Sequence, residues 1–314
     1  MIRSRSTWPM SIELVDDYIL DVLNGDRPAN RYEIGAVKRH VNDLQRDDVR
    51  FDEAAAMRAL DFFRFLKHSK GKWAGDTFEL QPWQAFIVAV LFGWKMLDGT
   101  RRFRTAYVEV PRKNGKTTLA AGIGLYGFFA DGEAGAEVYT AATKKDQARI
   151  AHGEATRMVK ASPGLMKRIR THRDNLHILE TASKFEPLGA DADTMDGLNV
   201  HMAIVDELHA HKTRNVWDVL ETATGARSQP MILAITTAGF DRHSICREQH
   251  DHTEKILDGV VQDDRYFGII YTLDADDDWQ DEITWVKANP NLGVSVSIDD
   301  MRTLASRAEQ IPTQ

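Results

Sequence analysis

The sequence predicts an α/β protein with a mostly parallel β-sheet flanked by helices, preceded by a helical N-terminal part. A β-rich run at 105–110 leads through a tight turn into a helix of small residues that opens at Gly115. After that helix, apolar runs of strand length alternate with helical patterns, which is typical of a parallel sheet covered on both faces. Two of these runs end in polar residues, at 206–207 and 236–237. Ligands of such sheets gather at the carboxyl ends of the strands.

Composition places the chain among folded globular proteins. Of its 314 residues 43% are hydrophobic and 28% are charged. The net charge of −7 argues against a chain that coats nucleic acid indiscriminately, so any nucleic-acid contact must come from a local basic surface. The single cysteine, Cys246, cannot form an internal disulfide, and a reducing cytosol is expected. We find no apolar run of membrane-spanning length and no signal peptide.

Residues 1–75 are predicted to form a helical N-terminal domain. The first helix has an apolar face that includes Val15, Tyr18 and Val22, and it is expected to stop at Asn24-Gly25. A second helix is expected at 32–45. A third is expected to start at an Asp52 cap and to run to about Lys67. We find no catalytic pattern in this part.

The segment 78–84 precedes an apolar helix predicted at 85–97 and is a candidate adenine site. The amides of Gln81 and Gln84 can each offer a donor and an acceptor to the adenine edge, and Trp83 can stack on the ring. The alternative interpretation is a helix start packed by Trp83. The position one helix upstream of the turn at 111–115 favours the adenine site.

The stretch 110–117 has the form of a phosphate-binding loop, the Walker A motif. Its strand–turn–helix context allows backbone N–H groups and the helix dipole to bind phosphates. Lys116 would place its charge between the β- and γ-phosphates, and Thr117 would offer a hydroxyl to Mg²⁺. Val110 stands where the usual pattern has its first Gly. The residues expected at the nucleotide are Pro111, Arg112, Lys113, Asn114, Gly115, Lys116, Thr117 and Thr118.

Further elements follow in order. A strand is predicted at 137–142, and Thr143 is expected to cap a helix that runs to about Lys160. Two short strands are predicted within 175–188. Buried strands are predicted at 201–205 and at 231–236, and the last strand at 266–272.

Two of these strands end in chemically useful residues. The run at 201–205 is followed by Asp206 and Glu207, as in a Walker B motif. Asp206 would hold Mg²⁺ opposite Thr117, and Glu207 would polarise the attacking water, which makes the reaction hydrolysis. The alternative is a strand that ends in two solvated acids. Thr236 or Thr237, after the run at 231–235, could sense the γ-phosphate and transmit its loss.

Together these motifs resemble the large terminase subunits of tailed bacteriophages. The resemblance covers about residues 78–293 and rests on PRKNGKTT, the segment 81–84, YTAAT with DQA, IVDELHAH, ITTAG and WVKANPNLG. It implies a RecA-like, ASCE-type phosphate-loop ATPase that uses ATP and Mg²⁺ to drive double-stranded DNA into a procapsid. Catalysis would involve Lys116, Glu207 and Arg112, the last acting in cis. The implied partners are portal protein, small terminase subunit and other copies in a ring, in the host cytoplasm at the portal vertex.

The sequence departs from this family in two places. Many relatives carry Arg-Gly shortly before Walker B, a candidate trans-acting arginine finger, whereas this chain has Asp196-Gly197. Arg149, Arg214 and Arg227 are the alternatives left open. The family's nuclease domain is expected to begin beyond residue 314. The predicted division is therefore 1–75, an ATPase core at 76–272, and a linker or lid at 273–314.

Charged clusters add one further candidate surface. An acid-free basic stretch could touch DNA phosphates or could be an ordinary solvated face; its members are Arg157, Lys160, Lys167, Arg168, Arg170 and Arg173. The acidic run at 274–282 is predicted to be a solvated turn, because two-metal nucleases draw carboxylates from separate strands. The pairs His209/His211 and His250/His252 lack a third zinc ligand, so we expect no structural metal.

Two other functions remain open from the sequence. A superfamily-2-type helicase or translocase needs a second lobe, and too few residues follow Thr237 for it. A nucleotide-dependent switch that binds ATP without turnover would have no need of the acid at Glu207.

Overall fold

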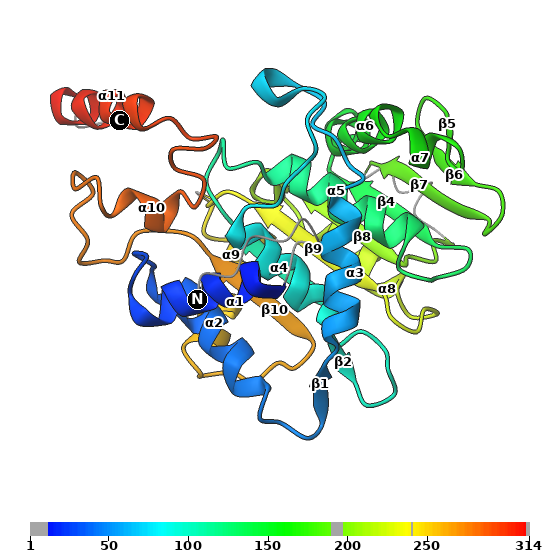
Figure 1. Ribbon diagram of the computed structural model, residues 1–314, viewed down its shortest axis with the longest axis horizontal. Coiled ribbons are helices and arrows are strands. Elements are labelled where there is room, and N and C mark those ends of the chain that lie inside the picture. The colour runs from blue at the N-terminus through cyan, green and yellow to red at the C-terminus, as the bar shows by residue number, and fades with distance from the viewer. Residues whose placement is uncertain (1–11, 190–196, 240, 312–314) are drawn as a thin grey trace, which may run out of the picture.

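A computed structural model describes residues 12–189, 197–239 and 241–311 of the chain. Its centre is an eight-stranded sheet (Figure 1). In spatial order the strands are β10 (Tyr266–Ile270), β3 (Thr105–Glu109), β9 (Met231–Thr236), β8 (Met202–Asp206), β4 (Glu137–Ala141), β7 (Ser183–Leu188), β6 (Leu176–Ile178) and β5 (Arg170–Thr171). The first six strands are parallel to one another. Strand β6 pairs antiparallel with β7, and β5 pairs antiparallel with β6 at that edge of the sheet. The predicted α/β fold with a mostly parallel sheet is confirmed.

Helices cover the sheet, and further helices precede and follow its strands in the chain. They are α1 (Ile12–Asn24), α2 (Arg31–Asp43), α3 (Glu53–Phe63), α4 (Pro82–Gly93), α5 (Lys116–Phe129), α6 (Lys145–Ala161), α7 (Pro163–Met166), α8 (Asn215–Thr222), α9 (Ile245–Leu257), α10 (Trp285–Ala288) and α11 (Ile298–Gln310). A two-stranded antiparallel sheet joins β1 (Val49–Phe51) and β2 (Trp94–Met96). Among the described residues no helix is long and apolar enough to cross a membrane.

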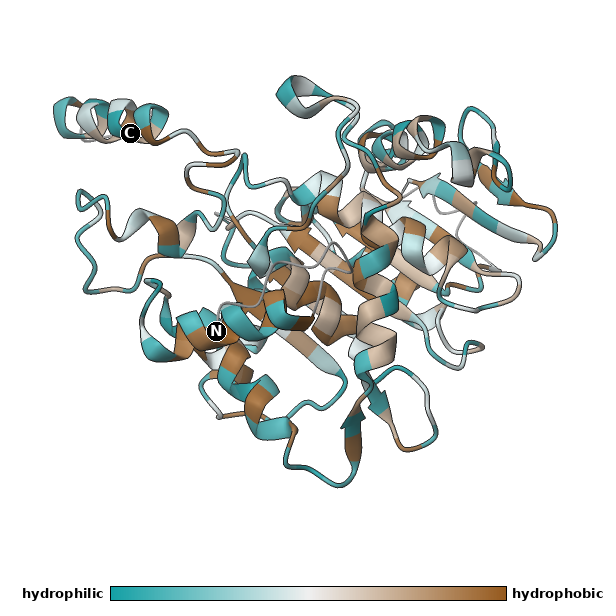
Figure 2. Cartoon of the chain, viewed as in Figure 1, coloured by the Kyte–Doolittle hydropathy of each residue, from teal (hydrophilic) through white to brown (hydrophobic). Residues whose placement is uncertain are grey.

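Successive side chains of a strand point to opposite sides of the sheet, and in the central strands both sets are buried. Ala106 and Val108 of β3 belong to one hydrophobic cluster, and Tyr107 between them belongs to another. The hydropathy colouring shows the central strands as a mostly apolar band, whereas α11 is largely hydrophilic (Figure 2). A strand buried on both faces reads as a continuous apolar run, which is why the sequence revealed these strands well.

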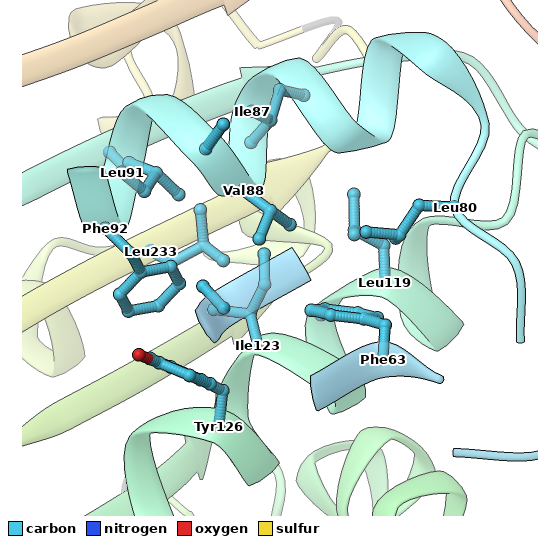
Figure 3. Close-up of a cluster of buried hydrophobic side chains, with 14 of the residues drawn as sticks. Phe63, Leu80, Ile87, Val88, Leu91, Phe92, Leu119, Ile123, Tyr126 and Leu233 are labelled. Carbon is cyan, nitrogen blue, oxygen red and sulfur yellow. The ribbon is translucent and has the colours of Figure 1, made fainter. Parts of the chain in front are cut away.

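Two helices that are apolar all round form the centre of the larger cluster. In α4 every residue from Trp83 to Gly93 is buried, and α5 is buried over nearly its whole length. A helix without a polar face must be covered on all sides. In Figure 3 the side chain of Val88 in α4 points toward that of Ile123 in α5, and both belong to this cluster. This packing fixes α5 and, with it, the loop at its amino-terminal end.

The N-terminal helices share this core. One cluster of buried residues contains Val15 of α1, Val37 of α2, Phe63 of α3 and Ile269 of β10. The hydroxyl groups of Tyr18 and Tyr271 lie 3.2 Å apart, and Arg39 Nη1 donates to the carbonyl of Tyr266. The division of the chain at residues 75 and 272 stays a prediction, since no boundary in the packing separates α1–α3 from the sheet.

Several predicted boundaries are wrong by a few residues. The first helix ends at Asn24 as predicted, and Asp52 caps α3 through the backbone N–H of Ala55. The third helix ends at Phe63 rather than near Lys67. The helix predicted at 85–97 ends at Gly93, because the next three residues form β2 and pair with β1.

The predicted Thr143 cap is also wrong. The N-cap position of α6 is Lys144, and its side chain makes no capping hydrogen bond. The two short strands predicted within 175–188 are present as β6 and β7, and the last predicted strand is present as β10. The edge strand β5, only two residues long, has no periodic signal in the sequence.

Close approach of α3 to α5 depends on a glycine. A Cβ atom added at Gly122 would lie 2.4 Å from Cε1 of Phe63, a ring that is 0% exposed. We expect Gly122→Ala to lower the free energy of unfolding by about 1–2 kcal/mol, because overpacking outweighs the better helix propensity of alanine. Chemical denaturation measures the change. Gly164→Ala is the control, since nothing lies within 4 Å of its Cβ position; equal effects would contradict the packing argument.

Candidate nucleotide site

The loop between β3 and α5 has the geometry of a phosphate-binding loop. Lys113 and Gly115 have φ angles of 69° and 81°, in the left-handed region that favours glycine. These two residues reverse the chain so that α5 begins directly at Lys116, with Gly115 as its N-cap. The free N–H groups of the first turn of α5 therefore face the space beyond the strand end, where an anion would sit.

Two acids lie beside this loop at the end of β8. Thr117 Oγ1 donates to Asp206 Oδ2 at 2.9 Å, and Lys116 Nζ lies 3.7 Å from Glu207 Oε1. Strand β9 lies between β3 and β8 and ends at Thr236. The carboxyl ends of three neighbouring parallel strands thus bring the predicted Lys116, Thr117, Asp206 and Glu207 together.

Burial shifts the pKa of Lys116 in the loop and of Asp206 beside it. Burial lowers the pKa of Lys116 below its ordinary value, against the opposing effect of the two carboxylates. Burial raises the pKa of Asp206 to about 6, with the hydrogen bond from Thr117 opposing the rise. A cation and a carboxylate held away from water are typical of sites that complete their charge balance with a ligand.

The donor set fits a magnesium ion. Asp206 Oδ1 is buried and has no hydrogen-bond partner among the described residues, while Thr117 supplies a neighbouring hydroxyl oxygen. Carboxylate and hydroxyl oxygens are the ligands that Mg²⁺ takes, together with water and phosphate oxygens. These two residues are therefore the ones that would hold the ion.

A histidine to which the sequence pattern assigned no role links Glu207 to the end of β9. His209 Nδ1 lies 3.1 Å from Glu207 Oε2, 3.1 Å from Thr236 Oγ1 and 3.2 Å from Thr237 Oγ1. The backbone N–H of His209 also donates to Thr236 Oγ1 at 3.1 Å. Glu207 has a left-handed φ of 58°, which is uncommon for a residue with a side chain and is frequent at functional sites.

A cavity of about 700 Å³ adjoins the phosphate loop at Gly115 and Thr118. That volume suits a small-molecule ligand. Gln81 and Gln84 line it, as the adenine-site prediction requires, but Trp83 does not; its aromatic lining includes Trp73 and Phe78. Trp83 is 1% exposed, and its Nε1 donates to Asn291 Oδ1 at 2.7 Å, which speaks against a stacking role. Trp73 lies in a loop before α4 that carries no motif.

The candidate arginines differ in whether their side chains are already bound to other residues. Arg112 is exposed beside the phosphate loop. Arg227 is committed to the interior, where it binds the Glu133 carboxylate and the carbonyls of Gly135 and Asn199. Arg149 pairs with Asp174 and Asp146, and Arg214 pairs with Asp218 and Glu248. Asp196, at the position where relatives carry the arginine, lies outside the described residues.

The basic stretch lies on one exposed part of the molecule formed by the end of α6, α7 and β5. Arg157 is bound to Glu154 and Ser69. The other five side chains are exposed, and within the described ranges none of them forms an ion pair; they are Lys160, Lys167, Arg168, Arg170 and Arg173. The acidic run forms a loop in which Lys287 Nζ binds Asp274 at 3.0 Å and Asp277 at 2.6 Å.

A buried ion pair holds the strand that precedes the phosphate loop. His250 Nδ1 lies 2.9 Å from Glu109 Oε2, and Glu109 is only 4% exposed. Burial lowers the pKa of His250, but the Glu109 hydrogen bond and the nearby carboxylates outweigh it and raise the pKa above its ordinary value. The pair therefore stabilises the fold below pH 6.5, and its contribution is lost as pH rises through the folded pKa of His250.

We expect His250→Gln to lower the melting temperature by about 2–3 °C more at pH 6 than at pH 9. The neutral amide cannot supply the charge that the protonated imidazole brings to Glu109. Thermal unfolding at both pH values measures the difference. His172→Gln, at an exposed position, is the control. An equal loss at the two pH values would show that charge plays no part.

The fold and this arrangement define a class. A phosphate loop after β3, two acids after β8 and strand β9 between them make an ASCE-type phosphate-loop NTPase fold. The family model for the terminase large subunit, ATPase domain, matches residues 82–255. This match covers more than half of the chain, and the chain therefore belongs to the large terminase family.

Individual relatives agree with this family. The large terminase subunit of Enterobacteria phage HK97 is 29% identical over 257 residues, which are 80% of this chain and 49% of that protein. Protein YmfN of Escherichia coli (strain K12) is 43% identical over 114 residues, 36% of this chain and 25% of that protein. The crystal structure of the HK97 bacteriophage large terminase superposes with a TM-score of 0.71 at 25% identity, covering 82% of this chain and 52% of that one. The chain spans about half or less of these relatives.

The predicted place of the nuclease domain is wrong. The family model for the terminase large subunit, endonuclease domain, matches residues 260–314, so that domain's sequence begins before residue 314. The absence of nuclease residues from this chain is therefore not supported. The match also includes β10, which pairs with β3 along its whole length. Residues assigned to the two domains by sequence thus share one sheet.

Proposed function

We propose that this chain is the ATP-hydrolysing part of a motor that moves double-stranded DNA into a viral procapsid. The observation that carries the proposal is the meeting of Lys116, Thr117, Asp206 and Glu207 at the ends of β3 and β8. Membership of the large terminase family supports the packaging role. In the assembled motor the partners would be portal protein, small terminase subunit and other copies of the chain.

Each residue has a separate task in this proposal. The backbone N–H groups of 112–118 and the Lys116 ammonium bind the phosphates, and Thr117 with Asp206 would hold Mg²⁺. When bound, the ion would neutralise the charge that develops on the phosphate oxygens. Glu207 orients a water molecule toward the γ-phosphate and accepts its proton. Because Glu207 contacts Lys116 in this structure, phosphate binding must draw Lys116 away before Glu207 can act.

The histidine contacts support the proposed coupling role of Thr236 and Thr237. His209 lies within 3.2 Å of Glu207, Thr236 and Thr237. A change at Glu207 on phosphate release would therefore reach the end of β9 through one side chain. The base would occupy the cavity beside Gln81, Gln84 and Trp73. Arg112 is exposed at the loop and, among the described residues, forms no ion pair that would keep it from the phosphates.

Two other functions fit less well. A switch that binds ATP without turnover has no use for Glu207 placed beside the phosphate loop in a left-handed conformation. A superfamily-2-type helicase would resemble the core alone, whereas the family match extends to both terminase domains.

The test is steady-state ATP hydrolysis in Mg²⁺ with and without linear duplex DNA. We expect turnover that requires Mg²⁺ and that DNA stimulates at low salt, with the stimulation falling steeply as salt rises. Hydrolysis that is the same with and without DNA at every salt concentration would contradict the motor role. Binding of ATP without any hydrolysis, with or without DNA, would favour the switch.

The basic surface gives a separate prediction about DNA. We expect a variant with Lys167, Arg168 and Arg170 all changed to alanine to bind duplex DNA about tenfold more weakly at low salt, with a smaller salt dependence. Fluorescence anisotropy of a labelled duplex measures both. A variant with Lys38, Lys255 and Arg64 changed to alanine loses the same charge elsewhere on the surface. Equal weakening in both variants would show that only net charge matters.

A further inference from the structure

The segment 289–295, which follows α10, is bound directly to the phosphate loop. Asn114, the loop residue before Gly115, is 0% exposed, and its side-chain amide donates to Asn289 Oδ1 at 3.1 Å. Its Oδ1 accepts from the backbone N–H of Asn291 at 3.0 Å. The same amide also donates to the carbonyls of Pro111 and Arg112, at 3.2 and 3.3 Å. Asn114 thus joins its own loop to a segment 175 residues away in sequence.

Asn291 makes the connection from the other side. It is 4% exposed, and its Nδ2 donates to the carbonyl of Asn114 at 3.0 Å and to Ser295 Oγ at 3.1 Å. Its Oδ1 accepts from Trp83 Nε1 in α4. Ser295 Oγ in turn donates to the carbonyl of Lys113 at 2.6 Å. Two consecutive backbone carbonyls of the phosphate loop are therefore held by side chains of one short segment.

That segment also forms a wall of the nucleotide cavity. Asn291, Val294 and Ser295 line the 700 Å³ cavity together with Gln81 and Gly115. Opposite them, Lys72 Nζ donates to the carbonyl of Val294 at 3.2 Å, so the cavity is bordered on two sides by loops that touch. A nucleotide whose phosphates lie on the loop would have its base or ribose against this segment.

We infer that residues 289–295 move or change their hydrogen bonds when a nucleotide occupies the phosphate loop. They transmit this change to the C-terminal part of the chain, with Asn291 as the positioning residue. The inference rests on the proposed function. The segment lies within the match to the endonuclease domain and leads directly into α11. A loop that moves on binding phosphates must carry Asn291 with it or break its hydrogen bonds, because every polar atom of both side chains is hydrogen-bonded.

The same contacts orient the loop before nucleotide arrives. Holding a loop in its bound conformation raises affinity, because less ordering is left to occur on binding. Loss of the Asn291 contacts should therefore weaken ATP binding and raise KM about tenfold, while kcat changes less than about twofold. Loss of the Ser295 contact alone should weaken binding about threefold. Ser295 lies nearer the surface, so Ser295→Ala tests the inference without disturbing the buried Trp83 contact.

The experiment combines affinity with hydrogen exchange. ATPγS with Mg²⁺ is titrated into the parent chain, Asn291→Ala, Ser295→Ala and Ser297→Ala, and amide exchange is followed in peptides covering 110–118 and 289–298. Ser297 caps α11 and makes no hydrogen bond to the phosphate loop among the described residues, so its variant is the control. In the parent we expect ATPγS to slow exchange in both segments. In saturated Asn291→Ala only 110–118 should be slowed.

The possible outcomes separate the two proposals. Parent-like affinity in Asn291→Ala and Ser295→Ala, or slowing confined to 110–118 in the parent, would overturn the inference and leave the nucleotide site intact. A lower melting temperature in Asn291→Ala with unchanged affinity and exchange would show a purely structural role and would also overturn it. A parent chain that binds no ATPγS would instead remove the proposed function, and the inference with it.

Discussion

The Glu207→Gln variant is expected to bind ATP with the affinity of the parent chain and to hydrolyse it about a thousandfold more slowly. General-base catalysis contributes a factor of this order, and glutamine keeps the size and most of the polarity of the side chain while losing the basic oxygen. Glu207 is one residue from Asp206 and lies beside Lys116, so it can reach a γ-phosphate held by the loop.

Two measurements are needed to interpret that variant. Single-turnover hydrolysis reports the chemical step, and equilibrium binding of ATP shows whether the site is still formed. Glu180→Gln, at an exposed turn position between β6 and β7, controls for the change of charge. If Glu207→Gln hydrolysed ATP as fast as the control, the water-activating role of Glu207 would be wrong, and another group near the γ-phosphate would have to supply it.

The Lys116→Met variant is expected to bind ATP about 100-fold more weakly than the parent. Methionine keeps the length of the buried stem and removes the charge, and truncating one member of a close charge pair costs about 2–5 kcal/mol. The fold should be preserved. Burial lowers the pKa of Lys116, so the cation is held at some cost in the nucleotide-free protein, and its loss should leave the melting temperature within about 2 °C of the parent.

Isothermal titration with Mg²⁺-ATP, together with thermal unfolding, measures both parts of this prediction. Lys38→Met, at an exposed position on α2, is the matched control. A Lys116→Met variant that binds ATP as tightly as this control would show that the loop holds phosphate through its backbone alone. A large loss of stability would show instead that Lys116 is mainly a partner of Glu207 in the folded core.

The sequence revealed the parts of the site that depend on local order. Lys116 and Thr117 follow a strand and open a helix, and Asp206 and Glu207 end an apolar run; each pattern fits within about ten residues. A strand that is buried on both faces has a long apolar run in its sequence, so the sheet was predictable too. The pairing of β3, β9 and β8 then brings these residues together without further information from the sequence.

The parts that the sequence did not reveal depend on contacts between distant segments. Trp83 was expected to stack on a base, but it is buried against Tyr271 and donates to Asn291. Trp73 lines the cavity from a loop with no periodic pattern. The family motif at 285–293 predicts no task from its sequence alone, whereas in the structure its asparagines are bonded to the phosphate loop. The spacing of His209 and His211 predicts no metal site and no other role, whereas His209 contacts the end of β9 in the structure.

The errors in the predicted helix cap and helix end have the same origin. Thr143 has the side chain that favours an N-cap, yet α6 starts two residues later. The helix after Trp83 stops at Gly93 because β1, more than 40 residues earlier in the chain, pairs with the residues that follow. Local propensity predicted the type of each element, and tertiary pairing decided where it ends.

The measurement that tests the account most directly is a crystal structure of the chain with Mg²⁺ and a non-hydrolysable ATP analogue. The account predicts phosphates on residues 111–118, the ion beside Thr117 and Asp206, Lys116 moved from Glu207 to the phosphates, and the base in the cavity lined by Gln81 and Trp73. Nucleotide bound elsewhere on the chain, or phosphates on the loop with Glu207 still bound to Lys116 and far from the γ-phosphate, would contradict it.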